Sequence, residues 1–235
     1  MRQFLMNRYR YRWLLIFSLL ALAIGGGFGA WVYRAPVALQ LTPPGLAEYV
    51  KFLSEVRFGQ LLIERLYFLL PLAVAAYSIP LIAVNEQLGL HWSLNWLLRL
   101  SVAPLALSLL SPIWAPDRLL NEEFRLQTFI AAGAIGLALF AFIFSKLSLR
   151  WLVLAVTLLS VRAVWLALQT FFLATEAIAA TYASPISLGW GGWLTIAGAA
   201  GLVVSAAWIW VMPNLIKPTP TREPRRDETK KAHEA

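Results

Sequence analysis

The chain contains no cysteine and only two histidines, His91 and His233, in 235 residues. The missing thiols exclude disulfides, thiolate metal sites, iron–sulfur ligation and a cysteine nucleophile. His233 lies in a polar C-terminal segment, so a pair of histidine haem ligands within the apolar segments is excluded as well. What remains for chemistry is a small set of carboxylates, amides and basic side chains.

Charged residues are also scarce. They make up 14% of the chain, whereas hydrophobic residues make up 60% and the mean hydropathy is +0.67. Soluble domains carry about 25% charged and about 45–50% apolar residues, so the composition excludes a water-soluble enzyme and a disordered chain. About six spans of roughly 20 residues would use half of the length and leave only loops and tails. We therefore predict an all-α fold, a polytopic membrane helix bundle of about six transmembrane helices.

The apolar runs define this organisation. A basic N-terminus (1–12) precedes a membrane domain (13–216), and a charged tail rich in proline (217–235) is predicted to be disordered. Between the first two spans, apolar residues recur at helical spacing and predict a short extracytoplasmic amphipathic helix over 46–58, lying on the outer surface or capping the bundle. The predicted spans are 13–33, 61–84, 94–114, 126–144, 151–174 and 188–212.

The first span admits two interpretations. Four arginines precede an apolar run, and Gly27 and Gly29 are small residues near its end, which resembles a signal peptide with a cleavage point. An apolar run of about 20 residues is long for a signal peptide and right for a membrane span. A retained anchor is the favoured interpretation.

The basic residues predict the orientation. Of the 20 lysines and arginines, 13 lie on the side that holds both termini, six lie on the other side, and Arg162 lies within a span. By the positive-inside rule both termini are cytoplasmic, and we expect a multi-pass protein of the cell (plasma) membrane. The weak point is the inner connection 85–93, which carries Glu86 and no basic residue.

The net charge of +8 is thus a topology signal, and nucleic acid is not expected as a partner. Ten of the eleven tryptophans lie near predicted span ends, where headgroups favour them; Trp165 lies deep.

Arg162, at the middle of the fifth predicted span, is the strongest candidate for a functional residue. An ionised group at that depth costs at least about 2.5–3.5 kcal/mol on insertion scales and requires partners. Gln169 and Glu176 follow at seven-residue steps, so all three share one helix face. The stripe is either an ion, proton, substrate or lipid-headgroup path, or a structural contact to carbonyls or a neighbouring chain. Glu64 completes the candidate intramembrane polar site, either facing this stripe across the bundle or anchoring the second span at the interface.

Prolines and small residues offer further alternatives. Pro71 and Pro80 in the second span, and Pro104 and Pro112 in the third, fit the broken helices of transporters or simple kinks. Small residues four apart predict close helix packing, either within the chain or against a partner subunit. These pairs are Gly25 with Gly29, Ala132 with Gly136, and Ala197 with Gly201. Arg99 is expected to extend to the cytoplasmic headgroups.

The sequence offers no enzymatic motif. It contains no HExxH or GxSxG pattern, and no aspartate lies inside a predicted span. His91 is expected at the membrane interface. We therefore expect no catalytic residue, cofactor or metal, and partners limited to the lipid bilayer and other membrane protein subunits. The expected role is a non-enzymatic accessory or interaction subunit of a membrane complex. The alternative is a small transporter or permease subunit that uses the fifth-span stripe, and a lipid-modifying enzyme is a distant third.

Overall fold

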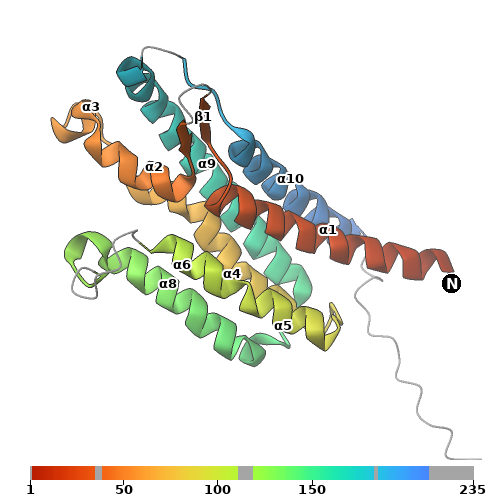
Figure 1. Ribbon diagram of the computed structural model, residues 1–235. Helices are drawn as coiled ribbons and strands as arrows, with labels where there is room; N and C mark the ends of the chain where they lie inside the picture. Colours follow the sequence, from red (N-terminus) through yellow and green to blue (C-terminus); the bar gives the residue numbers. More distant parts are fainter. Residues whose placement is uncertain (1, 35–38, 111–118, 183–184, 212–235) are drawn as a thin grey trace, which may run out of the picture.

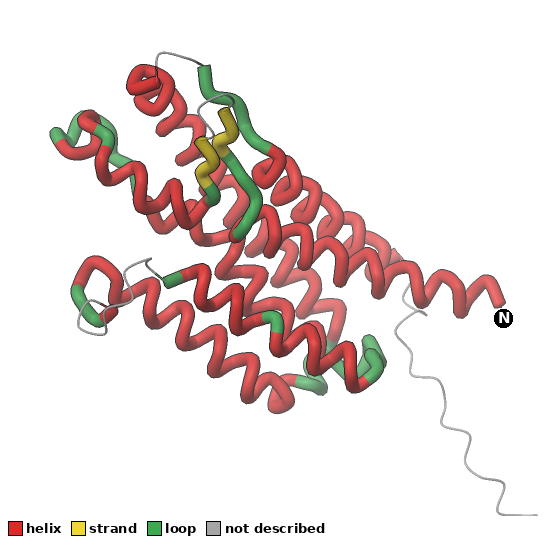
Figure 2. Tube along the Cα trace, viewed as in Figure 1, coloured by secondary structure: helices red, strands yellow, loops and turns green. Residues whose placement is uncertain are grey.

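The computed structural model describes residues 2–34, 39–110, 119–182 and 185–211, so the predicted tail and Pro112 lie outside the described residues. It is an all-α bundle with one short hairpin at one end (Figures 1 and 2). The hairpin pairs β1 (Val32–Arg34) with β2 (Leu39–Leu41). The long elements are α1 (Arg2–Gly27), α4 (Leu70–Val84), α5 (Trp92–Leu100), α6 (Val102–Leu109), α8 (Glu122–Phe140), α9 (Leu149–Tyr182) and α10 (Trp190–Val211). The short ones are α2 (Pro43–Tyr49), η1 (Val50–Phe52), α3 (Ser54–Arg57), η2 (Arg65–Leu69) and η3 (Ala141–Phe144).

Within the described ranges, four helical segments are long and apolar enough to cross a membrane. They overlap the predicted spans 61–84, 126–144, 151–174 and 188–212 and indicate a multi-pass membrane protein. The segments are Arg65–Val84, Glu122–Phe144, Leu149–Ala180 and Trp190–Val211.

The other two predicted spans have different forms. Over 13–33 the helix ends at Gly27, and the chain then extends into β1, with the backbone N–H of Trp31 donating to Leu41 O. Trp31, expected at headgroup level, is fully buried and donates its indole N–H to Gly25 O at 3.0 Å. Over 94–114 the helix is interrupted at Ser101, between α5 and α6. Pro104 explains this break, because its ring lacks an N–H and crowds the carbonyl four residues earlier.

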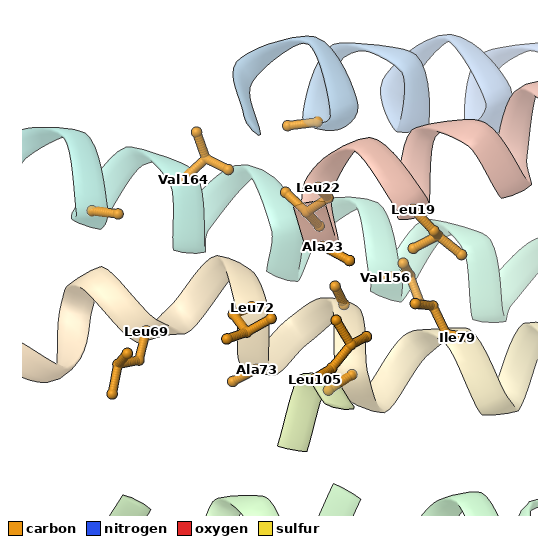
Figure 3. Close-up of a cluster of buried hydrophobic side chains, with 14 of the residues drawn as sticks. Leu19, Leu22, Ala23, Leu69, Leu72, Ala73, Ile79, Leu105, Val156 and Val164 are labelled. Atoms are coloured by element: carbon orange, nitrogen blue, oxygen red, sulfur yellow. The ribbon is translucent and has the colours of Figure 1, made fainter. Parts of the chain in front are cut away.

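The central helix of the bundle is α4. It packs against α1, α9, α6 and α8. The candidate span that contains it, Arg65–Val84, is 67% buried, against 28% for the span that contains α8. Leu72 and Ile79 of α4 lie among side chains from α1, α6 and α9 (Figure 3). Pro71 stands in the first turn of α4, where a missing N–H costs nothing, while Pro80 lies inside the helix. The bundle is therefore organised around one buried helix, with α8, α9 and α10 at its outside.

Glycines bring α1 and α10 into close contact, as small-residue packing requires. A Cβ on Gly25 would lie 2.5 Å from Thr195 Oγ1, and one on Gly198 would lie 2.6 Å from the backbone N of Leu22. Gly29 meets the backbone of Gly191 in the same seam. The predicted Gly25–Gly29 pair thus packs within the chain. On α8, in contrast, a Cβ on Gly136 would have no described atom within 4 Å, and Ala132 is exposed.

One end of the bundle, which we call the basic end, is fastened by hydrogen bonds between two loops. Asn85 is 1% exposed and donates to Leu147 O at 2.8 Å, while Gln87 accepts the Leu149 N–H at 3.0 Å. Trp151, at the start of α9, contacts Trp210 at the end of α10. The start of α1 and the end of α10 lie at this end in Figure 1.

Arg99, near the basic end, has protein partners in addition to any headgroup contact. Its Nε donates to Ala138 O at 2.8 Å and its Nη2 to Leu139 O at 2.9 Å, and the guanidinium lies 4.6 Å from the Trp96 ring centre. These carbonyls belong to the last turn of α8, where the backbone passes into η3. A cation at a helix C-terminus is favourable, so Arg99 joins α5 to α8.

The opposite end, which we call the hairpin end, carries the predicted amphipathic segment 46–58. It is α2, η1 and α3 in succession, with Leu53 in an extended conformation between the last two. Thr42 caps α2 by accepting the Gly45 N–H. Leu46, Val50 and Leu53 are nearly fully buried, so the apolar face caps the bundle.

Candidate functional site

The helix that carries the predicted polar stripe is much longer than a membrane is thick. The 34 residues of α9 span about 51 Å at ~1.5 Å per residue, against a hydrocarbon core of about 30 Å. Arg150 and Trp151 at its start are of the types that mark a membrane interface. Arg162 follows Arg150 by 12 residues, or about 18 Å along the axis. It therefore lies near mid-membrane depth.

The polar stripe faces away from the bundle. Arg162, Gln169 and Glu176 are all exposed. Leu158, one turn before Arg162, and Trp165 and Phe172, which stand between the polar residues, lie on the same face and are 62%, 56% and 59% exposed. Alternating steps of four and three residues, here from 158 to 176, produce the seam that two packed helices share. The chain leaves most of this seam uncovered, and we call these six residues the open seam.

Arg162 has no hydrogen-bond or ion-pair partner among the described residues. Neither Glu64 nor Glu176 pairs with it. Arg99, which also lies inside a predicted span, is bonded to two carbonyls. Arg162 is thus a cation inside a candidate membrane span, with its side chain on the outer surface of the bundle.

The structure brings two of the four predicted site residues together. Glu64 and Gln169 line one groove of about 420 Å³ between α9 and the chain preceding α4. Glu176 lines a neighbouring groove of about 310 Å³ with Glu55 and Gln60, and Leu173 borders both. Arg162 lines neither of them.

Both grooves carry negative charge. Hydrogen bonds from its own backbone N–H and from Ser54 hold the pKa of the Glu55 carboxyl below its usual range. Glu64 Oε1 accepts the Leu66 N–H at 3.2 Å and caps η2. Anionic grooves without a metal ligand set favour cationic or neutral polar groups. Within the described ranges, no cluster of three or more histidine, aspartate or glutamate side chains is arranged to hold a metal.

A charged cluster fixes η2, and with it Glu64. Arg65 Nη1 lies 3.1 Å from Glu48 Oε1, and Lys51 Nζ lies 2.5 Å from both Glu48 Oε2 and Glu123 Oε1. Arg65 also donates to the backbone oxygen of Glu123. Both cations stand over the Phe124 ring, at 4.8 and 5.3 Å from its centre. The cluster joins α2, η1 and η2 to the start of α8, so Arg65 has a structural role that its position near a span end did not reveal.

No family model, curated protein or solved structure matches this chain.

Sequence reasoning missed one polar residue of interest, Gln127 of α8. It is 3% exposed and its Oε1 has no hydrogen-bond partner among the described residues. The available signal was a lone amide in register with small residues, Ala131, Ala134 and Ala138, on the buried face of α8. An amide one turn before a stripe of buried alanines marks a position where packing alone does not explain the residue type.

Proposed function

We propose that this chain is a non-enzymatic accessory or interaction subunit of a membrane complex, and that the open seam of α9 packs against a membrane helix of a different subunit. Arg162 carries the proposal. Facing hydrocarbon, its charge would cost at least about 2.5–3.5 kcal/mol. A carboxylate at the same depth on a partner helix removes that penalty, and it forms a strong charge-assisted hydrogen bond in a medium without water.

The expected partner is another protein and not a second copy of this chain. Two copies in one membrane, related by a two-fold axis along the membrane normal, place identical residues at the same depth. Contact through the open seam would then set Arg162 against Arg162. Like charges in a low-dielectric medium repel strongly, so a heteromeric contact is favoured.

The proposal includes six crossings, with α1 and the α5–α6 pair added to the four candidate spans, and both termini in the cytoplasm of a cell with this protein in its plasma membrane. Lys146 and Arg150 flank Leu147 and Leu149, which take part in the hydrogen bonds of the basic end, and they support this orientation. It puts the hairpin, α2 and the grooves outside.

The proposal is tested by site-specific photo-crosslinking in native membranes. A photoreactive residue at Trp165 or Phe172 should give a discrete heteromeric adduct, and one at Phe129, equally exposed at 60% on α8, should not. Arg162→Leu should reduce the adduct at least tenfold, while Arg162→Lys should retain part of it. Reversing the charges, with Arg162→Glu here and Arg in place of the partner's carboxylate, should restore it. Adducts to lipid alone, or to a second copy alone, would overturn the proposal.

The small-transporter alternative finds its support in the groove of Glu64 and Gln169, which lies beside a helix with an intramembrane charge. It predicts substrate uptake into vesicles that is lost in Glu64→Gln and Gln169→Leu. The outward direction of Arg162 weighs against it, because a transport path is built inside a bundle or at an interface of repeats.

A further inference from the structure

A further cavity, distinct from the two grooves, shares Glu64 and Tyr67 with the groove of Glu64 and Gln169. It has a volume of about 290 Å³ and opens between η2 with α4 on one wall and α8 with the end of α6 on the other. Its polar members are Glu64, Tyr67 and Gln127, and the others are aliphatic: Leu66, Leu69, Leu70, Ala73, Leu109, Leu126 and Ile130. The volume is at the lower limit of small-molecule sites, about 300–1,000 Å³. It accommodates part of one hydrocarbon chain and not two.

Gln127 is the residue that makes this cavity more than a packing gap. Its side chain is almost fully buried, and Oε1 accepts no hydrogen bond from any part of the chain that the structure describes. Buried polar groups are nearly always paired, and one without a partner costs its full desolvation. Asn85, the comparable buried amide at the basic end, has both of its functions satisfied. Gln127 therefore brings an unpaired acceptor to the aliphatic wall of the cavity, with Oε1 itself covered by its neighbours.

The depth of the cavity defines what can reach Gln127. Glu123 and Phe124, one turn earlier on α8, belong to the charged cluster of Lys51 and Arg65. Gln127 thus lies about 6 Å beyond a charged layer, at ~1.5 Å per residue, where headgroups meet hydrocarbon. At that level a membrane lipid carries its junction between polar group and chain. A lipid hydroxyl there can donate to Oε1 once the Gln127 side chain turns toward the cavity, while the lipid chain fills the aliphatic part.

We propose that this cavity is a binding site for one chain of a neutral, hydroxyl-bearing membrane lipid, whose O–H donates to Gln127 Oε1. The carboxylate of Glu64 at the rim repels anionic headgroups such as a fatty acid or a phosphate monoester. The site does not involve the open seam, and the proposal is independent of the partner contact at Arg162.

The test uses the full chain in nanodiscs of phosphatidylcholine, with 1-monooleoylglycerol as probe. Its dimethyl ether has the same chain without O–H donors, and oleic acid at pH 8 has the same chain with an anionic head. Retained lipid is measured by native mass spectrometry and the melting temperature by differential scanning fluorimetry. We expect monooleoylglycerol to bind about tenfold more tightly than the ether, because one hydrogen bond is gained. Oleate should bind more weakly than both.

The decisive variant is Gln127→Leu. It should abolish the preference for monooleoylglycerol over the ether, retain binding of the ether, and raise the melting temperature of the lipid-free protein by removing an unpaired polar group. The matched control is Gln169→Leu in the neighbouring groove, which should leave the preference unchanged. If Gln127→Leu fails to fold, Gln127→Met serves, because it is also long and lacks the amide.

Three results would overturn the proposal. One is equal binding of monooleoylglycerol and its ether by the unmodified chain. Another is a preference that survives in Gln127→Leu or Gln127→Met. The last is binding of neither probe, which would mean that water alone serves Gln127.

Discussion

The seam between α1 and α10 and the open seam of α9 are two long helix surfaces, of which the first is covered by another helix of the chain and the second is left exposed. In the first, Gly25, Gly29 and Gly198 let two backbones of the same chain approach until no room for a Cβ remains. In the second, Leu158, Trp165 and Phe172 stand out from the bundle with Arg162 among them. Small residues allow a helix pair to close within a chain, whereas large and charged residues at the same kind of spacing require a surface supplied from elsewhere.

The same contrast separates two arginines. Arg99 meets the last carbonyls of α8 and the ring of Trp96, so its charge is used within the fold. Arg162 has no such partner among the described residues. An arginine within a membrane helix is therefore not informative by itself. Its surroundings decide whether it fastens the bundle or presents a charge.

The largest effect on stability is expected from Gly198→Leu, which places a side chain where α1 and α10 are in close contact. The new Cβ would lie 2.6 Å from the backbone N of Leu22 and 2.8 Å from Ser18 O, and backbone atoms cannot move aside as side chains do. We expect a loss of about 3 kcal/mol or more, at the upper end of overpacking costs, measured by thermal or denaturant unfolding in nanodiscs. The control Gly136→Leu introduces the same side chain into open space on α8 and should change stability by less than about 0.5 kcal/mol. Equal losses would remove the distinction between closed and open surfaces.

A smaller effect, with opposite signs, is expected for the two arginines. Arg99→Leu removes two charge-assisted hydrogen bonds and should destabilise the isolated chain by about 1.5–3 kcal/mol. Arg162→Leu should leave the isolated chain as stable or more stable, because it removes an unpaired charge, while weakening partner capture. Unfolding of both variants beside the unmodified protein measures the difference. Destabilisation of the isolated chain by Arg162→Leu would assign this arginine to the fold.

The smallest effect is expected at the hairpin end. Lys51→Met removes two ion pairs whose side chains are partly exposed, 26% for Lys51 and 50% for Glu123. Exposed pairs contribute about 0–1 kcal/mol, and the loss should shrink further in high salt. Melting temperatures at low and high salt measure it. A loss that is large and independent of salt would mean that the cluster is a buried support of η2 and of the lipid cavity.

Much of the architecture follows from the sequence, because apolar runs of membrane length admit only a helix once water is absent. Four of the predicted spans correspond to long apolar helices of the structure. Pro104 indicates an irregularity in the span 94–114, but it does not say that the helix is interrupted at Ser101, because a proline can cause either a kink or a break. The segment 46–58 shows the same limit, because its apolar spacing was clear while its extended residue, Leu53, was not.

The candidate site likewise has one property that the sequence predicts and one that it does not. Seven-residue spacing fixes Arg162, Gln169 and Glu176 on one face whatever surrounds the helix, because the geometry of a helix is local. Whether that face is inward or outward depends on which surfaces of α9 the other helices cover. Gln127 could not be singled out from the sequence, because a single amide in an apolar stretch is ordinary. Only the structure shows that no described residue donates a hydrogen bond to its Oε1.

By itself, the sequence determined a membrane-type helical chain, the extent of most of its helices, and the shared face of the polar stripe. Those properties depend on hydropathy and helix periodicity, which act within one segment. Only the tertiary structure decided that Arg99 is paired while Arg162 has no partner among the described residues, that Glu64 and Gln169 share a groove, and that Gln127 borders an aliphatic cavity. Pairing and burial are relations between distant segments, and they are fixed only when helices pack.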